Sequence, residues 1–211
     1  MTHIAEDHHS HVKGDAAFPQ TPASTAALSV ANRFYSPALL NHCVRSYLWA
    51  AMYAAAHDVA FDDELLFVSA MLHDIGLTDA FDSHRVHFEE AGGNLAWVFG
   101  MAAGWPTDRA ERAAEIIVLH MSGDVSATDD PESHILQVAT SWEVVGRRPE
   151  LFPEQARAEM LARYPRHGFG GEFLACFEDQ ALRKPGSSAA ASMANNGAGR
   201  IKANPLEGLD G

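Results

Sequence analysis

The chain has 211 residues, of which 47% are hydrophobic, and its 15 lysines and arginines against 28 aspartates and glutamates give a formal net charge of −13. This acidic balance argues against binding to nucleic acid or to an anionic membrane surface. No stretch approaches the roughly eighteen apolar residues of a membrane-spanning helix, and the N-terminus has no apolar secretory core. We therefore expect a cytoplasmic protein with a small-molecule substrate, without nucleic-acid or membrane partners, for which a homo-oligomer is an option.

The two ends of the chain differ from its middle. Residues 1–30 mix His, Ala, Ser, Thr and Pro without helical periodicity, and residues 186–211 are rich in Gly, Ala, Ser and Asn. Such segments bury too little apolar surface to offset the entropy lost on ordering. We expect two disordered tails around one domain that spans residues 31–185. The N-terminal tail would hold four solvated histidines that can bind metal adventitiously, namely His3, His8, His9 and His11.

The first two predicted helices carry the clearest signals. Ser36-Pro37 is a good helix start, and apolar residues then recur with a helical period to about His57. The next helix is expected to begin at Asp62 or Asp63 and to stop at Gly76. Its apolar residues face nearly all directions, so we expect this helix to be buried.

Five further helices are predicted after residue 76. The segments 87–103 and 130–146 have helical periodicity, and Asp108 with Glu111 forms a capping-box pattern ahead of a third. Two more are introduced by Pro153 and by the glycines around residue 170. Alternating strand patterns are absent from the sequence. The prediction is an all-α fold, a compact bundle of about six to eight helices.

Polar residues interrupt the apolar faces of these helices at a few positions. His42 lies in the first turns of its helix, and His73-Asp74 closes the buried helix. His120 interrupts the apolar run EIIVLHM, and Glu143 lies in the middle of another apolar helix. Because a buried charge is costly unless it is paired or bound to a metal, a shared cation explains these groups most simply. Imidazole with carboxylate ligation favours Zn, Fe, Mn or Co over Ca.

A second His-Asp pair, His57-Asp58, is excluded from this site. It ends an alanine-rich segment ahead of a turn, without the buried helix or the Ile-Gly sequence that accompanies His73-Asp74. Neighbouring side chains on a helix point about 100° apart, so His73 and Asp74 can bind one ion only near a helix end.

With these polar residues in this order along the chain, the sequence resembles the HD-domain superfamily of metal-dependent enzymes. The resemblance is closer to the cyanamide hydratase-like branch of that superfamily. The similarity covers roughly residues 38–185. It is carried by the ordered segments NHCVRSYLW, LHDIGLT, FEEAGG, EIIVLHM, ILQVATSWEVVG, YPRHGFGGEF and KP.

The resemblance implies an HD-domain fold that holds one divalent transition metal ion, with Zn²⁺ expected and Fe²⁺ or Mn²⁺ as alternatives. The implied ligands are His42, His73, Asp74 and Glu143. The family has an aspartate as its last ligand where this chain has Glu143, and a carboxylate there can instead pair with Arg45 or Arg147.

The resemblance also implies a reaction, the addition of water to a nitrile-like carbon, with cyanamide to urea as the type reaction. The catalytic residues would be Asp74, Glu89 and His120, with Glu89 or His120 returning a proton to nitrogen. For His120 the alternative is a core histidine bonded to the backbone.

Two other functions are compatible with the residues. One is a phosphohydrolase that acts on a nucleotide or small phosphoester, although the central helices offer only Arg45, Arg85, Arg109 and Arg112 to bind phosphate. The other is a non-catalytic binding or sensing module, in which Glu143 has weakened the metal site.

Overall fold

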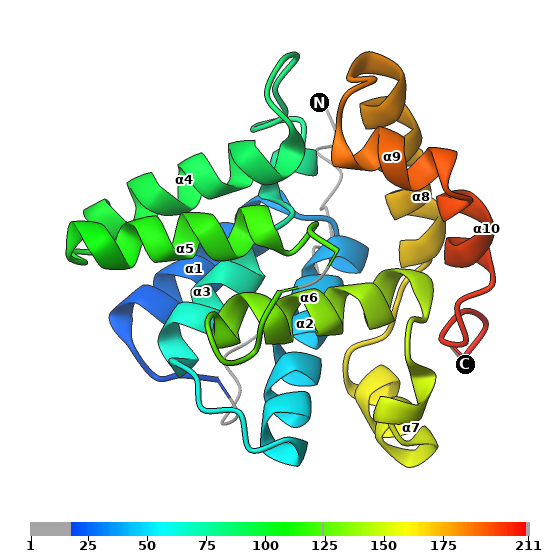
Figure 1. Cartoon of the computed structure of the whole chain (residues 1–211), viewed down its shortest axis with the longest axis horizontal. Helices are drawn as coiled ribbons and strands as arrows, with labels where there is room; N and C mark the ends of the chain where they lie inside the picture. The colour runs from blue at the N-terminus through cyan, green and yellow to red at the C-terminus, as the bar shows by residue number, and fades with distance from the viewer. Residues whose placement is uncertain (1–17, 124, 210–211) are drawn as a thin grey trace, which may run out of the picture.

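The computed structural model describes residues 18–123 and 125–209 and is shown in Figure 1. In these residues the chain forms ten α-helices and two short 3-10 helices, and no β-strand is present among them. The predicted all-α fold is confirmed. Nowhere in the described ranges is a helix long and apolar enough to cross a membrane. The N-terminal histidines lie outside the described residues.

The helix bounds in chain order are α1 Pro22–Phe34, α2 Pro37–Ala56, α3 Asp63–Leu72, η1 Ile75–Leu77, α4 Phe88–Ala102, α5 Thr107–Leu119, α6 Pro131–Val145, η2 Pro149–Leu151, α7 Glu154–Arg163, α8 Phe169–Arg183, α9 Ser188–Ala194 and α10 Gly197–Lys202.

The predicted helix starts follow local capping chemistry in most cases. The side chains of Ser36, Asp62 and Asp130 each accept a hydrogen bond from the backbone N–H three residues later, at the starts of α2, α3 and α6. The capping box predicted at Asp108 is wrong, because α5 begins at Thr107 without a side-chain cap. Proline immediately before Thr107 sets the start of that helix instead.

The buried helix α3 ends earlier than predicted. Its last residue is Leu72, and His73 and Asp74 lie in a turn before η1. Gly76 belongs to η1, where an added Cβ would lie 2.2 Å from the carbonyl oxygen of Phe88 in α4. The glycine is therefore required by the close approach of η1 to α4, and not by the end of the helix.

Both segments that were expected to be disordered contain helices. α1 begins at Pro22, and α9 and α10 follow residue 187. The C-terminal segment buries three apolar side chains, Ala189, Ile201 and Leu206, and its helices pack against α6 and α8. Low-complexity composition hid these few anchors, which suffice because a folded surface is there to receive them. Between the two segments the seven helices α2 to α8 agree with the predicted six to eight.

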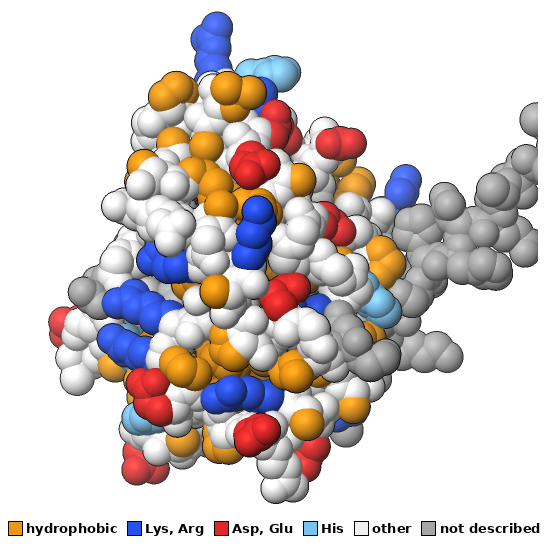
Figure 2. Space-filling view, turned by 90° about the vertical axis from the view of Figure 1, so that its right-hand side faces the viewer, with side chains coloured by type: hydrophobic (Ala, Val, Ile, Leu, Met, Phe, Trp, Pro, Cys, Tyr) orange, Lys and Arg blue, Asp and Glu red, His pale blue; other side chains and the backbone are white. Residues whose placement is uncertain are grey.

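Helix α2 lies at the centre of the fold and packs against α3, α6 and α8. α4 and α5 form an antiparallel pair at one edge, and α8, α9 and α10 lie at the opposite edge (Figure 1). The face towards these last helices carries basic and acidic side chains among hydrophobic ones, and neither sign of charge dominates it (Figure 2). Between the two edges, His42 of α2 meets His73 and Asp74, which follow the end of α3.

Candidate metal centre

Two imidazole nitrogens and one carboxylate meet where α2 faces the turn after α3. His42 Nε2 lies 3.2 Å from His73 Nε2, and these atoms lie 3.3 and 3.2 Å from Asp74 Oδ2. All three side chains are almost completely buried. The structure thus brings together three of the four predicted ligands, with one ligand atom of each within 4.8 Å of the others.

The turn after α3 explains how neighbouring residues can face one point. His73 keeps helical backbone angles, but Asp74 leaves them, at φ −103° and ψ 9°. Nδ1 of His73 donates a hydrogen bond of 2.8 Å to the carbonyl oxygen of Ala70. This bond places the ring proton on Nδ1 and leaves Nε2 available as a ligand.

The ring of His42 is held by stacking and lies near a carboxylate. It stacks on Phe169 at the start of α8, with ring centroids 4.2 Å apart and an interplanar angle of 11°. Its Nδ1 lies 3.8 Å from Glu143 Oε1. His42 Nδ1 has no hydrogen-bond partner among the described residues, so the stacking on Phe169 is the contact that orients the ring, with Nε2 turned towards Asp74.

The donor set fits a divalent transition metal ion. Both carboxylate oxygens of Asp74 are buried, and neither has a hydrogen-bond partner among the described residues. A buried carboxylate left in this state is costly. A cation between Asp74, His42 and His73 would satisfy the carboxylate and both Nε2 atoms at once, and two imidazoles with one carboxylate suit such an ion.

The two neighbouring ligands strongly affect each other's protonation. Burial opposes the charged form of His73, but the Asp74 carboxylate outweighs it and raises the pKa of His73 well above its ordinary value. Burial likewise opposes ionisation of Asp74, yet His73 and then His42 hold the pKa of Asp74 well below its usual range. A metal ion would take the place of the proton on His73, because a ligating imidazole nitrogen must be deprotonated.

Glu143 is not part of this three-residue group. Its Oε1 accepts hydrogen bonds from Arg45 at 2.5 and 2.8 Å and from Arg166 at 2.8 Å, and its Oε2 accepts one of 3.0 Å from Trp49. Burial opposes ionisation, but the guanidinium of Arg45 and then His42 and Arg166 hold the pKa of Glu143 well below its usual range.

The pairing with Arg45 that the sequence left open is therefore present, and Arg166 is a further partner that sequence reasoning missed. The sequence offered no local signal for this pairing, because the burial of Arg166 is visible only in the structure. The role of Glu143 as a metal ligand stays a prediction.

His120 lies beside the group formed by His42, His73 and Asp74, which we call the metal group. Its Nε2 is 4.0 Å from Asp74 Oδ1, and its ring centroid is 4.9 Å from that of His73. Its Nδ1 donates to the carbonyl oxygen of Ile117, so Nε2 is unprotonated. Burial and then the charge of His73 lower the pKa of His120 to about 4, which leaves the ring neutral near pH 7. His120 is both a backbone-bonded core histidine and a neighbour of the site.

Glu89 lies in the first turn of α4 and does not share this environment. Its Oε1 is 3.9 Å from His87 Nδ1, and its buried Oε2 has no hydrogen-bond partner within the described part of the chain. It is absent from the described residues that line the cavity in front of the metal group. Its catalytic role stays a prediction. His57 and Asp58, which the sequence excluded, are exposed.

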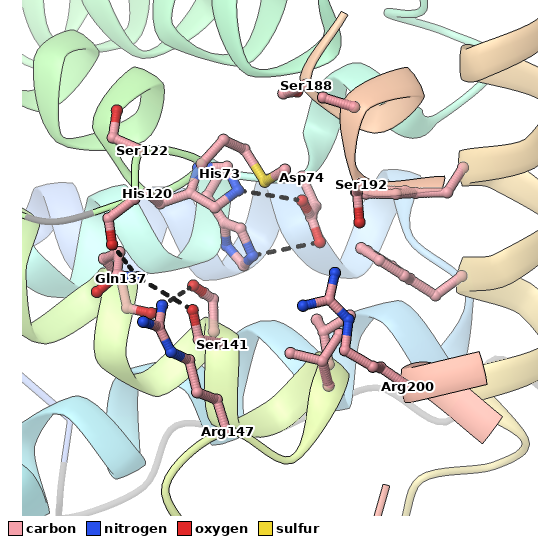
Figure 3. A pocket seen from close by; sticks show the side chains of 18 of the residues that line it. His73, Asp74, His120, Ser122, Gln137, Ser141, Arg147, Ser188, Ser192 and Arg200 are labelled. Atoms are coloured by element: carbon pink, nitrogen blue, oxygen red, sulfur yellow. Dashed lines mark hydrogen bonds and ion pairs between the residues drawn. The ribbon is translucent and has the colours of Figure 1, made fainter. Parts of the chain in front are cut away.

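The metal group opens onto a cavity of about 670 Å³. His42, His73, Asp74 and His120 form one wall, and Figure 3 shows the labelled residues around it. Residues of α9 and α10 form another wall, including Ser188, Ser192 and Arg200. Sequence reasoning missed this wall, although Ser187, which caps α9 by accepting the N–H of Ala190, was a usable signal.

Comparison with known proteins agrees with this site. The HD domain matches residues 39–144, half of the chain, and this range includes the three grouped ligands. Two proteins of Saccharomyces cerevisiae, cyanamide hydratase DDI2 and cyanamide hydratase DDI3, are each 28% identical over 177 residues, which cover 81% of this chain and 78% of the relative. The chain belongs to the HD-domain family and, within it, resembles the cyanamide hydratases.

Proposed function

We propose that this HD-type enzyme hydrates a small molecule at a carbon–nitrogen multiple bond, as in the conversion of cyanamide to urea. The observation that carries the proposal is the buried group of His42, His73 and Asp74. It opens onto a cavity, and neither oxygen of Asp74 has a hydrogen bond from a described residue. The names of the yeast relatives support the reaction type.

His42, His73 and Asp74 would hold the ion, which when bound lowers the pKa of water to near neutrality and polarises the electrophile. We propose zinc, with iron or manganese as alternatives, since two imidazoles and a carboxylate are a common catalytic zinc set. Cys43 and Cys176 are free thiols, and this supports a reducing compartment such as the cytoplasm.

The remaining steps fall to the residues around the ligands. The water oxygen bonds to the nitrile carbon, one carbon–nitrogen π bond opens, and the proton released by water goes to nitrogen. His120 would move this proton, and the proposal is supported by its position lining the cavity, with Nε2 4.0 Å from Asp74 Oδ1. Phe173, Phe177 and Val144 line the cavity with apolar surface and limit the water around the substrate.

A second candidate function is hydrolysis of a small phosphoester. It is favoured by Arg147 and Arg200, which line the cavity. The four arginines that the sequence offered for phosphate, Arg45, Arg85, Arg109 and Arg112, are not among the described residues that line it.

Metal analysis of wild type, His73→Ala and His84→Ala tests the proposal. We expect about one ion per chain in wild type and in His84→Ala, an exposed histidine, and loss of the ion in His73→Ala. All three proteins keep the N-terminal histidines, so the difference reports the buried group. Urea formation from cyanamide should then follow the metal content. If the wild-type protein neither contains nor takes up metal, the proposed reaction is refuted, and the non-catalytic binding or sensing module is the function that remains.

A further inference from the structure

Two arginines line the cavity and have no side-chain partner among the described residues. Arg147 follows the end of α6 and Arg200 lies on α10, and both line the cavity. Within the described residues, neither guanidinium group forms an ion pair, a side-chain hydrogen bond or a ring contact. Figure 3 shows Arg200 extending towards Asp74, and Arg147 on the other side of the view beside Gln137 and Ser141.

Both arginines are exposed residues, and another exposed arginine, Arg85, likewise has no ion pair among the described residues. What distinguishes Arg147 and Arg200 is that they line the cavity. Asp74 is the one acidic side chain among the described residues that line the cavity, and it faces the metal group. The two positive charges therefore remain available to a bound molecule.

The surroundings of the arginines also suit an anion. Ser188 and Ser192 also line the cavity, and Ser188 Oγ is buried without a hydrogen-bond partner among the described residues. A hydroxyl in this position can donate to an oxyanion, and arginine binds carboxylate or phosphate with two parallel hydrogen bonds.

The size of the cavity points the same way. Its volume of about 670 Å³ is room for about 20 water molecules and lies in the usual range for drug-sized ligands. A molecule as small as cyanamide would leave most of it to water. The cavity therefore fits a larger substrate, whose remote end reaches the arginines while its reactive carbon lies at the metal group.

We propose that the substrate carries an oxyanion, a carboxylate or a phosphate that does not react, and that Arg147 and Arg200 bind it across the cavity from the metal ligands. The proposal rests on the proposed function for the reacting end of the substrate. Both arginines lie outside residues 39–144, so this subsite is not part of the matched HD domain.

Calorimetric titration with simple probes tests the subsite. The probes are inorganic phosphate, malonate and the uncharged malonamide. We expect saturable binding of phosphate or malonate and no binding of malonamide. Whether phosphate or malonate binds shows whether the oxyanion of the substrate is a phosphate or a carboxylate. Arg147→Gln and Arg200→Gln should each raise Kd about tenfold or more, since each removes a charged hydrogen-bonding partner.

Two variants make the same change in charge close by. Arg148→Gln and Lys202→Gln alter exposed residues next to the arginines in sequence and should keep the wild-type Kd. Because an oxyanion can also bind a metal ion directly, the titrations are repeated with His73→Ala, where binding through the arginines should survive.

Three results would each overturn the subsite. Neither oxyanion binds saturably, or the arginine variants bind with the wild-type Kd. The third is that His73→Ala loses binding while the arginine variants keep it. The metal content of the same preparations separates this failure from failure of the proposed function. A wild type that holds its ion but binds no oxyanion refutes the subsite only.

Discussion

Glu143 Oε1 lies 3.8 Å from Nδ1 of His42, while Nε2 of the same ring lies 3.3 Å from Asp74 Oδ2. The carboxylate therefore stands behind the imidazole, on the side of the ring away from the three-residue group. His42 Nδ1 has no hydrogen-bond partner among the described residues, so Glu143 acts on this ring through its charge, and a carboxylate near a histidine ligand raises the basicity of that ligand. Arg45 and Arg166 in turn hold the carboxylate in place.

Glu143→Gln tests this relationship through both stability and metal binding. The variant leaves Arg45 buried without a carboxylate partner, while Arg166 keeps its ion pair with Glu207, and we expect the free energy of unfolding to fall by about 3–5 kcal/mol. Metal affinity should fall about 10- to 100-fold, as expected for a carboxylate near a metal ligand. Urea denaturation and metal titration measure the two effects.

The exposed Glu150→Gln serves as the control for this change and should behave as wild type. If a folded Glu143→Gln protein binds no metal at all, Glu143 is itself a ligand and the family pattern is kept with the longer side chain.

Gly76→Ala should destabilise the fold next to the metal group. The new Cβ would lie 2.2 Å from the carbonyl oxygen of Phe88, so η1 and α4 must move apart. We expect a loss of about 1–3 kcal/mol in the free energy of unfolding, with weaker metal binding because Asp74 lies two residues away. Thermal and chemical unfolding measure the loss.

Gly171→Ala is the matched control. It lies within α8, and its added Cβ would meet nothing within 4 Å. Alanine there should stabilise the protein by about 0.5–1 kcal/mol. Equal effects of the two substitutions would refute the packing argument for Gly76.

Ile201→Ala tests whether the C-terminal helices are an integral part of the fold. Ile201 in α10 is 2% exposed, and its truncation should cost about 2–5 kcal/mol. Lys202→Ala changes the next residue, which is exposed, and should change the free energy of unfolding by less than about 0.5 kcal/mol. A variant at Ile201 that unfolds like wild type would mean that α10 is not packed in solution.

Acid should destabilise the protein partly through Asp130. Burial opposes its ionisation, but hydrogen bonds from Arg112 and Ser133 lower the pKa of Asp130 below its ordinary value. The folded state therefore binds this proton less readily than the unfolded state does. The stabilisation is fully present above the unfolded pKa of about 3.9 and is lost as pH falls through the folded pKa.

Asp130→Asn provides the measurement. Asparagine can still cap α6, but it cannot pair with Arg112. Between about pH 5 and pH 2, the melting temperature should fall less in this variant than in wild type, while Glu178→Gln, an exposed control, should follow wild type. Parallel curves for Asp130→Asn and wild type would show that the ion pair contributes nothing.

The sequence predicted features that depend on neighbouring residues. Ser36, Asp62 and Asp130 cap helices by bonding three residues along the chain, and such signals survive in any tertiary context. His42, His73 and Asp74 stood out because polar groups inside apolar helices need a common partner, and the structure brings them together.

Features that depend on distant partners were not predictable in this way. The pairing of Glu143 with Arg166 requires α6 to meet the segment before α8, which no local pattern encodes. The helices α9 and α10 were missed because their alanine-rich sequence is ordered by contacts with α6 and α8 and not by its own hydrophobicity. The early end of α3 reflects the packing of η1 against α4.

The position of α9 and α10 at the end of the chain has a consequence for how the site is assembled during translation. The ribosome releases the three ligand-bearing residues well before Ser188 and Arg200, and the segments of a chain fold in the order of their synthesis. The metal group can thus form while one wall of the cavity is still missing and solvent has free access to it. The last two helices then add the wall that carries Ser188, Ser192 and Arg200, so an ion can reach its ligands before that part of the cavity is built.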